Sequence, residues 1–320
     1  MGSNARGFLV GGSLVLVAAA ASVCAQPPRV QWNDVLRQDA AWYSTAEAAA
    51  VADNVLRYQR ESGGWPKDID MVGRPAGPPP ARPDATIDNG ATTTQIRFLA
   101  HFAADKYRKA AIRGIDYLLD AQYPNGGWPQ FFPVRQDYSR YITFNDDAMV
   151  NALLVLEDVA AGTEAFGFVD AGRRERAAAA VRKATPLILK SQVTVSGTRT
   201  VWGAQHDEVT LEPRNARAFE PVALASAESV GIVRFLMRRP KTPEIAAAVE
   251  AAVAWFKASR LPDGRWARFY EIGTNRPIFA GRDGIVRYSL EEIEEERREG
   301  YAWYGTWPRN LVEKAHPAWR

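Results

Sequence analysis

The sequence has a single cysteine, Cys24, among its 320 residues. This residue lies near the end of an apolar N-terminal run, residues 8–21 and the small residues after it, which is typical of a secretory signal and too short to span a bilayer comfortably. We predict a signal peptide over residues 1–25, cleaved before Gln26, and a secreted or periplasmic location. The mature chain would then have no thiol, which excludes disulfides, thiolate metal sites and a cysteine nucleophile.

Other absences narrow the function further. The three histidines, His101, His206 and His316, show no metal-ligand spacing, and there is no G-x-S-x-G motif and no P-loop. No later apolar run is long enough for a membrane span. The net charge of +3 is too small to indicate nucleic acid. We therefore expect neither a membrane nor a nucleic-acid partner.

What the sequence does contain is a repeat. Residues 121–132 read AQYPNGGWPQFF, and residues 59–68 read QRESGGWPKD. Two further segments resemble them. The four tryptophans of the series follow one another at intervals of 63, 74 and 64 residues, and they are Trp65, Trp128, Trp202 and Trp266. Self-similarity at so long a period indicates a repeated supersecondary unit.

Each repeat is interpreted as a pair of helices. Apolar residues recur at helical spacing over residues 112–119, and residues 243–259 are rich in strong helix formers. We predict an all-α fold, an α/α toroid (incomplete α/α barrel) of repeated helix pairs with long functional loops, in a single domain over residues 26–320. Gly126 and Gly127 are expected to end an outer helix. The tryptophan after them is expected to cap the core, and the alternative is that at least one such ring stacks on a sugar.

Acidic and amide side chains gather at two predicted helix starts. The segment TIDNG places Asp88 and Asn89 at one start, and FNDDAM places Asp146 and Asp147 at the other. The simpler interpretation is helix N-capping, which Asp and Asn do well. If both are inner helices of one toroid, however, their N-termini open on the same rim. Oxygen ligands brought together there would suit a hard cation such as Ca²⁺.

Arginines form a second group in the C-terminal half. Arginine holds carboxylates in a bidentate fork, so these residues are candidates for binding an acidic substrate. The alternative is ion pairing with the many nearby glutamates. Arg282 is unusual because it lies between Gly281 and Gly284 with only Asp283 intervening, in a turn that can present its side chain to a ligand.

Seven segments together resemble a known family. They read GGWPKD, TIDNGATTTQIRFLA, AQYPNGGWPQFFP, ITFNDDAM, ARAFEP, RWARFYEIGTNRPIFAGRDG and EERREGYAWYGTWP. In this order, from about Gly63 to Pro308, they look like the motif series of polysaccharide lyase family 10 pectate lyases. The resemblance implies an α/α toroid that cleaves α-1,4-polygalacturonate by Ca²⁺-dependent β-elimination and releases 4,5-unsaturated oligogalacturonates. We expect a monomer.

The resemblance also implies roles for individual residues. Arg282 of the GRDG motif is expected to be the Brønsted base. The expected Ca²⁺ site takes Asp88 and Asp146, with Asn89 and Asp147 beside them. The expected substrate-binding residues are Arg217, Arg268, Arg297 and Lys67, with Arg298 the alternative within the double-arginine motif and Lys67 the first alternative for the base.

Two rival functions stay open at this point. A non-catalytic protein of the same fold would bind uronate without cleaving it. An α/α-toroid glycoside hydrolase would use a carboxylate pair, which could be drawn from Asp146, Glu208 and Asp283, although no spacing favours it.

Overall fold

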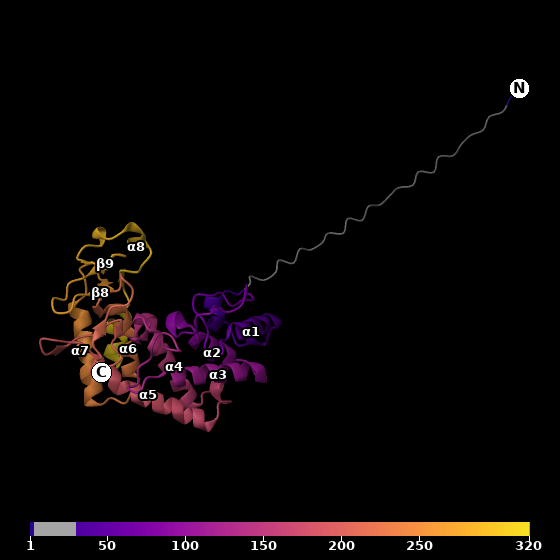
Figure 1. The fold of residues 1–320 in the computed structure, drawn as a ribbon, viewed down its shortest axis with the longest axis horizontal. Helices are drawn as coiled ribbons and strands as arrows, with labels where there is room; N and C mark the ends of the chain where they lie inside the picture. The colour runs from indigo at the N-terminus through magenta and orange to yellow at the C-terminus, as the bar shows by residue number, and fades with distance from the viewer. Residues whose placement is uncertain (3–29, 320) are drawn as a thin grey trace. The chain divides into compact units, whose positions relative to one another are not determined.

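The computed structural model describes residues 1–2 and 30–319, so the predicted signal peptide lies outside the described residues apart from its first two. The contacts divide the chain at Val30, and residues 31–320 form one unit. Most of this unit is helical (Figure 1). The α-helices are α1 (Ala46–Tyr58), α2 (Thr93–Ala100), α3 (Asp105–Ala121), α4 (Ala148–Ala161), α5 (Ala171–Ser191), α6 (Ser226–Met237), α7 (Pro243–Ala258), α8 (Glu295–Glu299) and α9 (His316–Trp319).

The helices pair as the repeat predicted. Each of α2, α4 and α6 packs on the helix that follows it, namely α3, α5 and α7. Contacts also run along each series, from α2 to α4 to α6 and from α1 to α3 to α5 to α7, so the helices form two layers. The prediction of a mostly helical fold is confirmed. In the described part of the chain no helix is long and apolar enough to cross a membrane.

The repeated tryptophans end the helices of one layer. All four rings are fully buried. The indole Nε1–H of Trp65 donates to the carbonyl of Val55 in the last turn of α1, at 2.8 Å. Trp128 does the same to Leu118 of α3 at 2.7 Å. The other two, Trp202 and Trp266, donate to the last turns of α5 and α7. Each indole satisfies one of the four carbonyls that a helix leaves without a partner at its C-terminus.

The glycines before these tryptophans form the next turn rather than the helix end, which corrects one expectation. Helix α3 ends at Ala121, and Gln122 carries on in extended conformation. Gly126 follows with φ +104°, and a Cβ there would lie 2.5 Å from the carbonyl oxygen of Lys183. The glycine pair therefore allows the chain to turn tightly against the next helix of the same layer.

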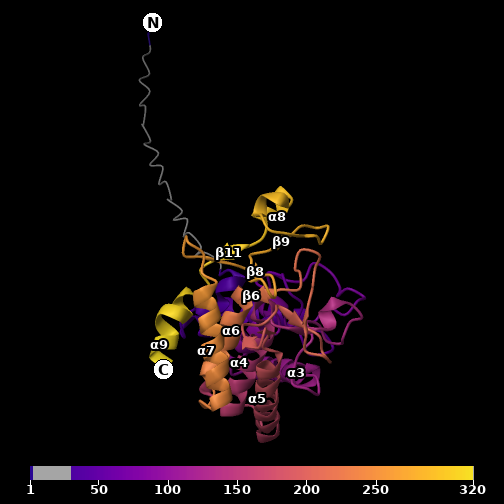
Figure 2. The same cartoon turned by 90° about the vertical axis from the view of Figure 1, so that its left-hand side faces the viewer.

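Short strands join the helices at one end. They are β1 (Ile142–Thr143), β2 (Thr194–Val195), β3 (Thr198–Arg199), β4 (Gln205–His206), β5 (Pro213–Arg214), β6 (Leu224–Ala225), β7 (Trp266–Ala267), β8 (Phe269–Tyr270), β9 (Phe279–Ala280), β10 (Val286–Arg287) and β11 (Tyr304–Gly305). All pairings are antiparallel: β1–β4–β5, β2–β3, β6–β8, β7–β11 and β9–β10. Both views place β9 and α8 beyond one end of the helix layers (Figures 1 and 2).

That end has a small aromatic core of its own. Phe219, Phe269, Phe279 and Trp303 are buried together, with Tyr301 packed against them. Short 3₁₀ and π turns complete the chain: η1 (Trp32–Arg37), η2 (Trp42–Ser44), η3 (Asp88–Gly90), η4 (Tyr138–Arg140), η5 (Asn145–Asp147), η6 (Glu164–Phe166), η7 (Leu290–Glu292) and the π-helical η8 (Leu311–Ala315). The aromatic core and the turns η3 and η5 hold the residues of the candidate site.

Candidate active site

Two equivalent turns, η3 and η5, bring the predicted acidic residues together. Asn89 in η3 has φ 50° and ψ 33°, and Asp146 in η5 has φ 50° and ψ 34°. Asn89 and Asp146 therefore occupy equivalent positions in the two turns. The residues just before them, Asp88 and Asn145, are equivalent to each other as well. The two turns contact one another directly, and η5 also contacts α6. The two helix starts therefore lie side by side, as the sequence led us to expect.

Asp88 is the buried anion of this site. Its side chain is 2% exposed, and its Oδ2 accepts a hydrogen bond from the Lys67 ammonium at 2.5 Å. Within the described residues its other oxygen, Oδ1, is buried without a hydrogen-bond partner. Burial alone would lower the pKa of Lys67, but the bonds to Asp88 and the charge of Asp68 outweigh it and raise that pKa. Lys67 is thus held charged beside Asp88.

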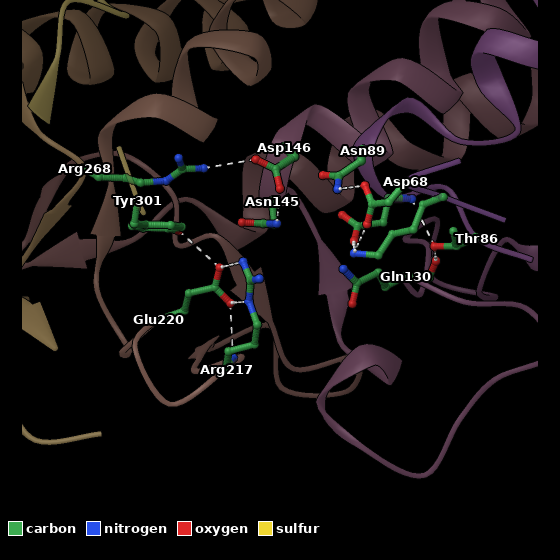
Figure 3. Close-up of polar contacts among 12 residues, drawn as sticks. Asp68, Thr86, Asn89, Gln130, Asn145, Asp146, Arg217, Glu220, Arg268 and Tyr301 are labelled. Atoms are coloured by element: carbon green, nitrogen blue, oxygen red, sulfur yellow. Dashed lines mark hydrogen bonds and ion pairs between the residues drawn. The ribbon is translucent and has the colours of Figure 1, made fainter. Parts of the chain in front are cut away.

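Asn145 and Asp146 add oxygens from the second turn. The Asn145 amide donates to Oδ2 of Asp146 at 2.7 Å, while its own Oδ1 is buried with no partner among the described residues. The other oxygen of Asp146 lies 3.1 Å from Arg268. Asn89, by contrast, donates to Asp68 at 2.7 Å (Figure 3).

Asp147 lies apart from these groups. Its carboxylate lies against α6, where only the missing side chain of Gly231 leaves room: a Cβ there would be 2.0 Å from Oδ1 of Asp147. Burial, together with the charges of Glu228 and Asp146, raises the pKa of Asp147 to about 6. The structure therefore places Asp147 between helices and not with Asp88 and Asp146.

Arg217 is clamped by Glu220. Its Nε and Nη2 donate to the two carboxylate oxygens at 2.9 and 2.5 Å, and its backbone N–H donates to the same group at 3.1 Å. These bonds to Glu220 raise the pKa of Arg217. The charges of Arg217 and Lys67 also act on each other, and both act on Tyr138. Arg217 therefore belongs to the same electrostatic environment as the Lys67–Asp88 pair.

Arg268 reaches the acidic turns from the other side. It donates to Glu228, which is buried in the first turn of α6, and it contacts Asp146. Burial opposes the charge of Arg268, but Glu228 and the other anions outweigh it, so the pKa of Arg268 is raised. Burial in turn raises the pKa of Glu228. Arg268 thus links the end of the molecule that holds the aromatic core to Asp146 in η5.

Arg297 joins the group through an aromatic ring. The guanidinium carbons of Arg217 and Arg297 lie 4.6 and 4.7 Å from the centre of the Phe219 ring. Arg298 instead donates to the backbone carbonyls of Glu291 and Ile293. The geometry thus favours Arg297 over its neighbour as a site residue.

Arg282 lies at the outer edge of this group. Its side chain is 62% exposed, and its Nε and Nη2 donate to Glu296 at 3.1 and 2.9 Å. Glu296 also pairs with Arg297, so one carboxylate bridges the two arginines. The hydrogen bonds that Arg282 donates to Glu296 raise the pKa of Arg282. In this conformation Glu296 and Arg297 connect Arg282 to the site.

The donor set on the two turns suits a hard cation. Within the described residues Asp88 Oδ1 and Asn145 Oδ1 are buried oxygens without hydrogen-bond partners, and Asp146 adds a partly exposed carboxylate. Calcium takes six to eight such oxygens. Among the described residues no three His, Cys, Asp or Glu side chains form a ready metal cluster. The chemistry of these oxygens therefore fits a hard cation such as Ca²⁺.

A cavity of about 840 Å³ opens beside these turns, between η1 and the start of α2. Lys67, Asp68 and Asn89 line it, so it adjoins the acidic turns. An extended ligand could therefore continue from the site toward η1.

Comparison with known proteins identifies the family. The family model for pectic acid lyases matches residues 59–265 and 262–312. The structure of a family 10 polysaccharide lyase from Cellvibrio cellulosa is 36% identical, has a TM-score of 0.81, and covers 90% of this chain and 95% of that chain. The chain belongs to the pectic acid lyase family. The enzyme is therefore a lyase, and the resemblance found in its sequence is confirmed.

A second structure shows a mutant of the Cellvibrio cellulosa lyase in complex with trigalacturonic acid. It is also 36% identical to this lyase, with a TM-score of 0.80, and covers 89% of this chain and 95% of that chain. The comparison with curated proteins gave no match.

Several residues of the lyase's site were missed by sequence reasoning. Asn145 was not among the predicted ligands, although Asp88, which occupies the equivalent position in the other turn, was. Aligning the two turns residue by residue would have found it. Glu220, Glu228 and Tyr301 left no such signal, because their partners are distant in sequence.

Proposed function

We propose that this lyase cleaves α-1,4-polygalacturonate by Ca²⁺-dependent β-elimination and releases 4,5-unsaturated oligogalacturonates. One observation carries the proposal: oxygen-rich turns and a set of arginines meet at one site, through the 3.1 Å contact between Asp146 and Arg268. The Cellvibrio cellulosa structure with trigalacturonic acid supports the choice of substrate. A polyuronate substrate needs both the oxygen-rich turns, which would hold a cation, and the arginines, since each of its sugars carries a carboxylate.

The reaction makes clear what the residues must do. A base takes the proton from carbon 5, the bond between carbon 4 and the glycosidic oxygen breaks, and a double bond forms between carbons 4 and 5. Negative charge builds up on the carboxylate attached to carbon 5. A bound Ca²⁺ would stabilise this charge as a Lewis acid. Arg268 and Arg217 would add fixed positive charge in the same region.

Asp88, Asn145 and Asp146 are the residues that would hold the cation. Asp88 and Asn145 each contribute an oxygen that has no hydrogen-bond partner among the described residues, and Asp146 contributes the exposed carboxylate. The sequence also predicted Asn89 and Asp147 beside them. Asn89 hydrogen-bonds Asp68, and Asp147 faces Gly231, so in the proposal they support the turns rather than the cation.

The base is proposed to be an arginine. The sequence predicted Arg282, which would first have to leave Glu296. Arg217 is proposed in its place because it lies in the electrostatic environment of Lys67 and Asp88, although it too would have to be released from its carboxylate partner, Glu220. An arginine base is demanding, since its reference pKa is above ~12. Nearby cations, including a bound metal, would disfavour another positive charge and make deprotonation easier.

The hydrolase alternative receives no support from the carboxylates proposed for it. Asp146 is paired with Arg268, Glu208 with Arg140, and Asp283 with Arg287. The bond from Arg287 lowers the pKa of Asp283 to about 2, whereas a general acid needs a raised pKa. A non-catalytic uronate-binding protein is the other alternative, and family membership argues against it.

We further propose that the two helix layers form an incomplete α/α toroid, and that residues 26–320 act as one catalytic domain and as a monomer. The predicted signal peptide supports secretion or export to the periplasm.

The direct test is the ultraviolet absorbance of unsaturated product from polygalacturonate, with and without a chelator. We expect absorbance to rise in the untreated sample, to stop after chelation, and to return when Ca²⁺ is added back. New reducing ends without absorbance would indicate a hydrolase. Binding without either product would indicate the non-catalytic alternative, and full activity under chelation would remove the cation from the proposal.

A further inference from the structure

Tyr301 links the two central arginines, because it contacts Glu220, which holds Arg217, and it contacts Arg268 directly. Its hydroxyl donates to Oε1 of Glu220 at 3.2 Å, the same oxygen that accepts from Arg217. The guanidinium of Arg268 lies over its ring, 4.9 Å from the centre. Figure 3 shows Tyr301 between the Arg217–Glu220 pair and Arg268.

The ring of Tyr301 is itself held rigidly. Phe219 meets it edge-on with ring centres 5.4 Å apart, Trp303 at 4.9 Å, and Phe269 stacks at 6.4 Å. Phe219 also lies against Arg217 and Arg297. The aromatic core therefore contacts three arginines, Arg217, Arg268 and Arg297, and holds them near one another despite their mutual repulsion.

Burial raises the pKa of the Tyr301 phenol. The hydroxyl therefore stays protonated and can donate to Glu220 throughout the neutral and mildly alkaline range. Glu220 is almost fully buried, and its charge is kept by the bonds to Arg217, which outweigh burial and lower its pKa. Tyr301 thus orients the carboxylate that orients Arg217.

We propose that Tyr301 is a positioning residue that holds Arg217 and Arg268 at a fixed separation in the uronate-binding site. The hydroxyl acts through Glu220 on Arg217, and the ring face acts on Arg268. This inference rests on the proposed uronate-binding function of the site. It assigns Tyr301 no contact with the reacting atoms.

Two substitutions separate the two contacts. Tyr301→Phe removes the hydroxyl and keeps the ring, and Tyr301→Leu removes both. Loss of one hydrogen bond to a carboxylate should weaken trigalacturonate binding about three- to tenfold. Loss of the ring should weaken it by roughly a further two- to fivefold, because a cation–π contact is also lost. Calorimetric titration measures both, and thermal unfolding shows that each variant is folded.

Tyr288 is a matched control outside the site. Its hydroxyl donates to Glu271 at 2.7 Å, and the guanidinium of Arg276 lies 3.8 Å from its ring centre. The chemistry is therefore the same as at Tyr301. We expect Tyr288→Phe to leave trigalacturonate affinity unchanged. An equal loss in this variant would overturn the proposal.

A double-mutant cycle tests whether Tyr301 acts through the arginines. In an Arg217→Lys background, Tyr301→Phe should cause no further loss of affinity. In an Arg268→Lys background, the extra loss from Tyr301→Leu over Tyr301→Phe should vanish. Simple additivity in both cycles would overturn the proposal, because a purely structural tyrosine would give it.

A readout that needs no substrate keeps this inference distinct from the proposed function. The Nε–H signal of Arg217 in ¹⁵N NMR spectra reports how firmly the guanidinium is held. We expect faster hydrogen exchange of this signal in Tyr301→Phe and an unchanged rate in Tyr288→Phe. Failure of the wild type to bind trigalacturonate would refute the proposed function alone. An unchanged Arg217 signal in Tyr301→Phe would refute the positioning role alone.

Discussion

Replacing Trp128 is the sharpest test of what the repeated tryptophans do. The ring is fully buried, and its indole N–H satisfies the Leu118 carbonyl in the last turn of α3. Emptying such a site costs ~3–5 kcal/mol for a large aromatic residue. Leaving a buried carbonyl unpaired costs a further ~1–3 kcal/mol. We therefore expect Trp128→Ala to lower the free energy of unfolding by about 4–8 kcal/mol.

Trp128→Phe separates the two contributions. It keeps most of the ring but removes the donor, so the loss should be about 1–3 kcal/mol. Urea denaturation followed by far-ultraviolet circular dichroism measures both variants. Trp42 provides a control, because its indole donates to Glu47 at the surface, at 3.0 Å. Trp42→Phe should change the free energy of unfolding by less than about 0.5 kcal/mol.

The reasoning would be refuted if Trp128→Ala unfolded within about 1 kcal/mol of the wild type. Unchanged stability together with weaker trigalacturonate binding would instead place Trp128 in the substrate site. Weaker binding together with lost stability would not distinguish the two roles, so binding is measured at a temperature where the variant is fully folded.

Three further predictions concern the cation, the pH dependence of stability and the binding of substrate. Asp146→Ala should raise the Ca²⁺ concentration needed for half-maximal activity at least tenfold. Asp147→Asn should leave that concentration unchanged, because Asp147 faces Gly231. Ca²⁺ titrations in which Asp147→Asn has the larger effect would contradict the assignment. His206 is buried, and burial lowers its pKa to about 4. The pKa of this imidazole in the unfolded chain is about 6.5, so its contribution to the free energy of unfolding should be fully present above pH ~6.5 and should be lost, by about 3 kcal/mol, as the pH drops to ~4. Urea titrations in which His206→Gln shows the same dependence of stability on pH would contradict this. Glu228→Gln should weaken trigalacturonate binding by roughly tenfold through Arg268, and an unchanged calorimetric affinity would argue against that link.

Much of the helical scaffold could be predicted because it repeats. The period of the tryptophans and the Asp/Asn-rich turns are local patterns, and local patterns repeat visibly in a sequence. The same logic predicted that Asp88 and Asp146 would meet on one rim. The helix end at Ala121 was missed because the indole of Trp128 replaces the glycine cap that was expected there.

The arginine network could not be predicted in the same way. Arg268 and Asp146 are 122 residues apart, and Tyr301 and Glu220 are 81 apart. Which carboxylate each arginine selects depends on how the strands at one end fold back over the turns. Family resemblance named the four arginines but not their partners. The unpredicted partner matters most for Arg282, because its ion pair with Glu296 affects whether Arg282 can act as the base.

The central claim is that an arginine of this network removes the carbon-5 proton. It is tested most directly by single-turnover formation of unsaturated product in Arg217→Lys and Arg282→Lys, with trigalacturonate affinity measured beside it. The variant that lacks the base should lose roughly 10²–10⁴-fold in rate, while its dissociation constant stays within about tenfold of the wild type. From the geometry we expect this result for Arg217→Lys and a mainly weaker affinity for Arg282→Lys. The opposite split would return the base to Arg282, and near-wild-type rates in both variants would contradict the account.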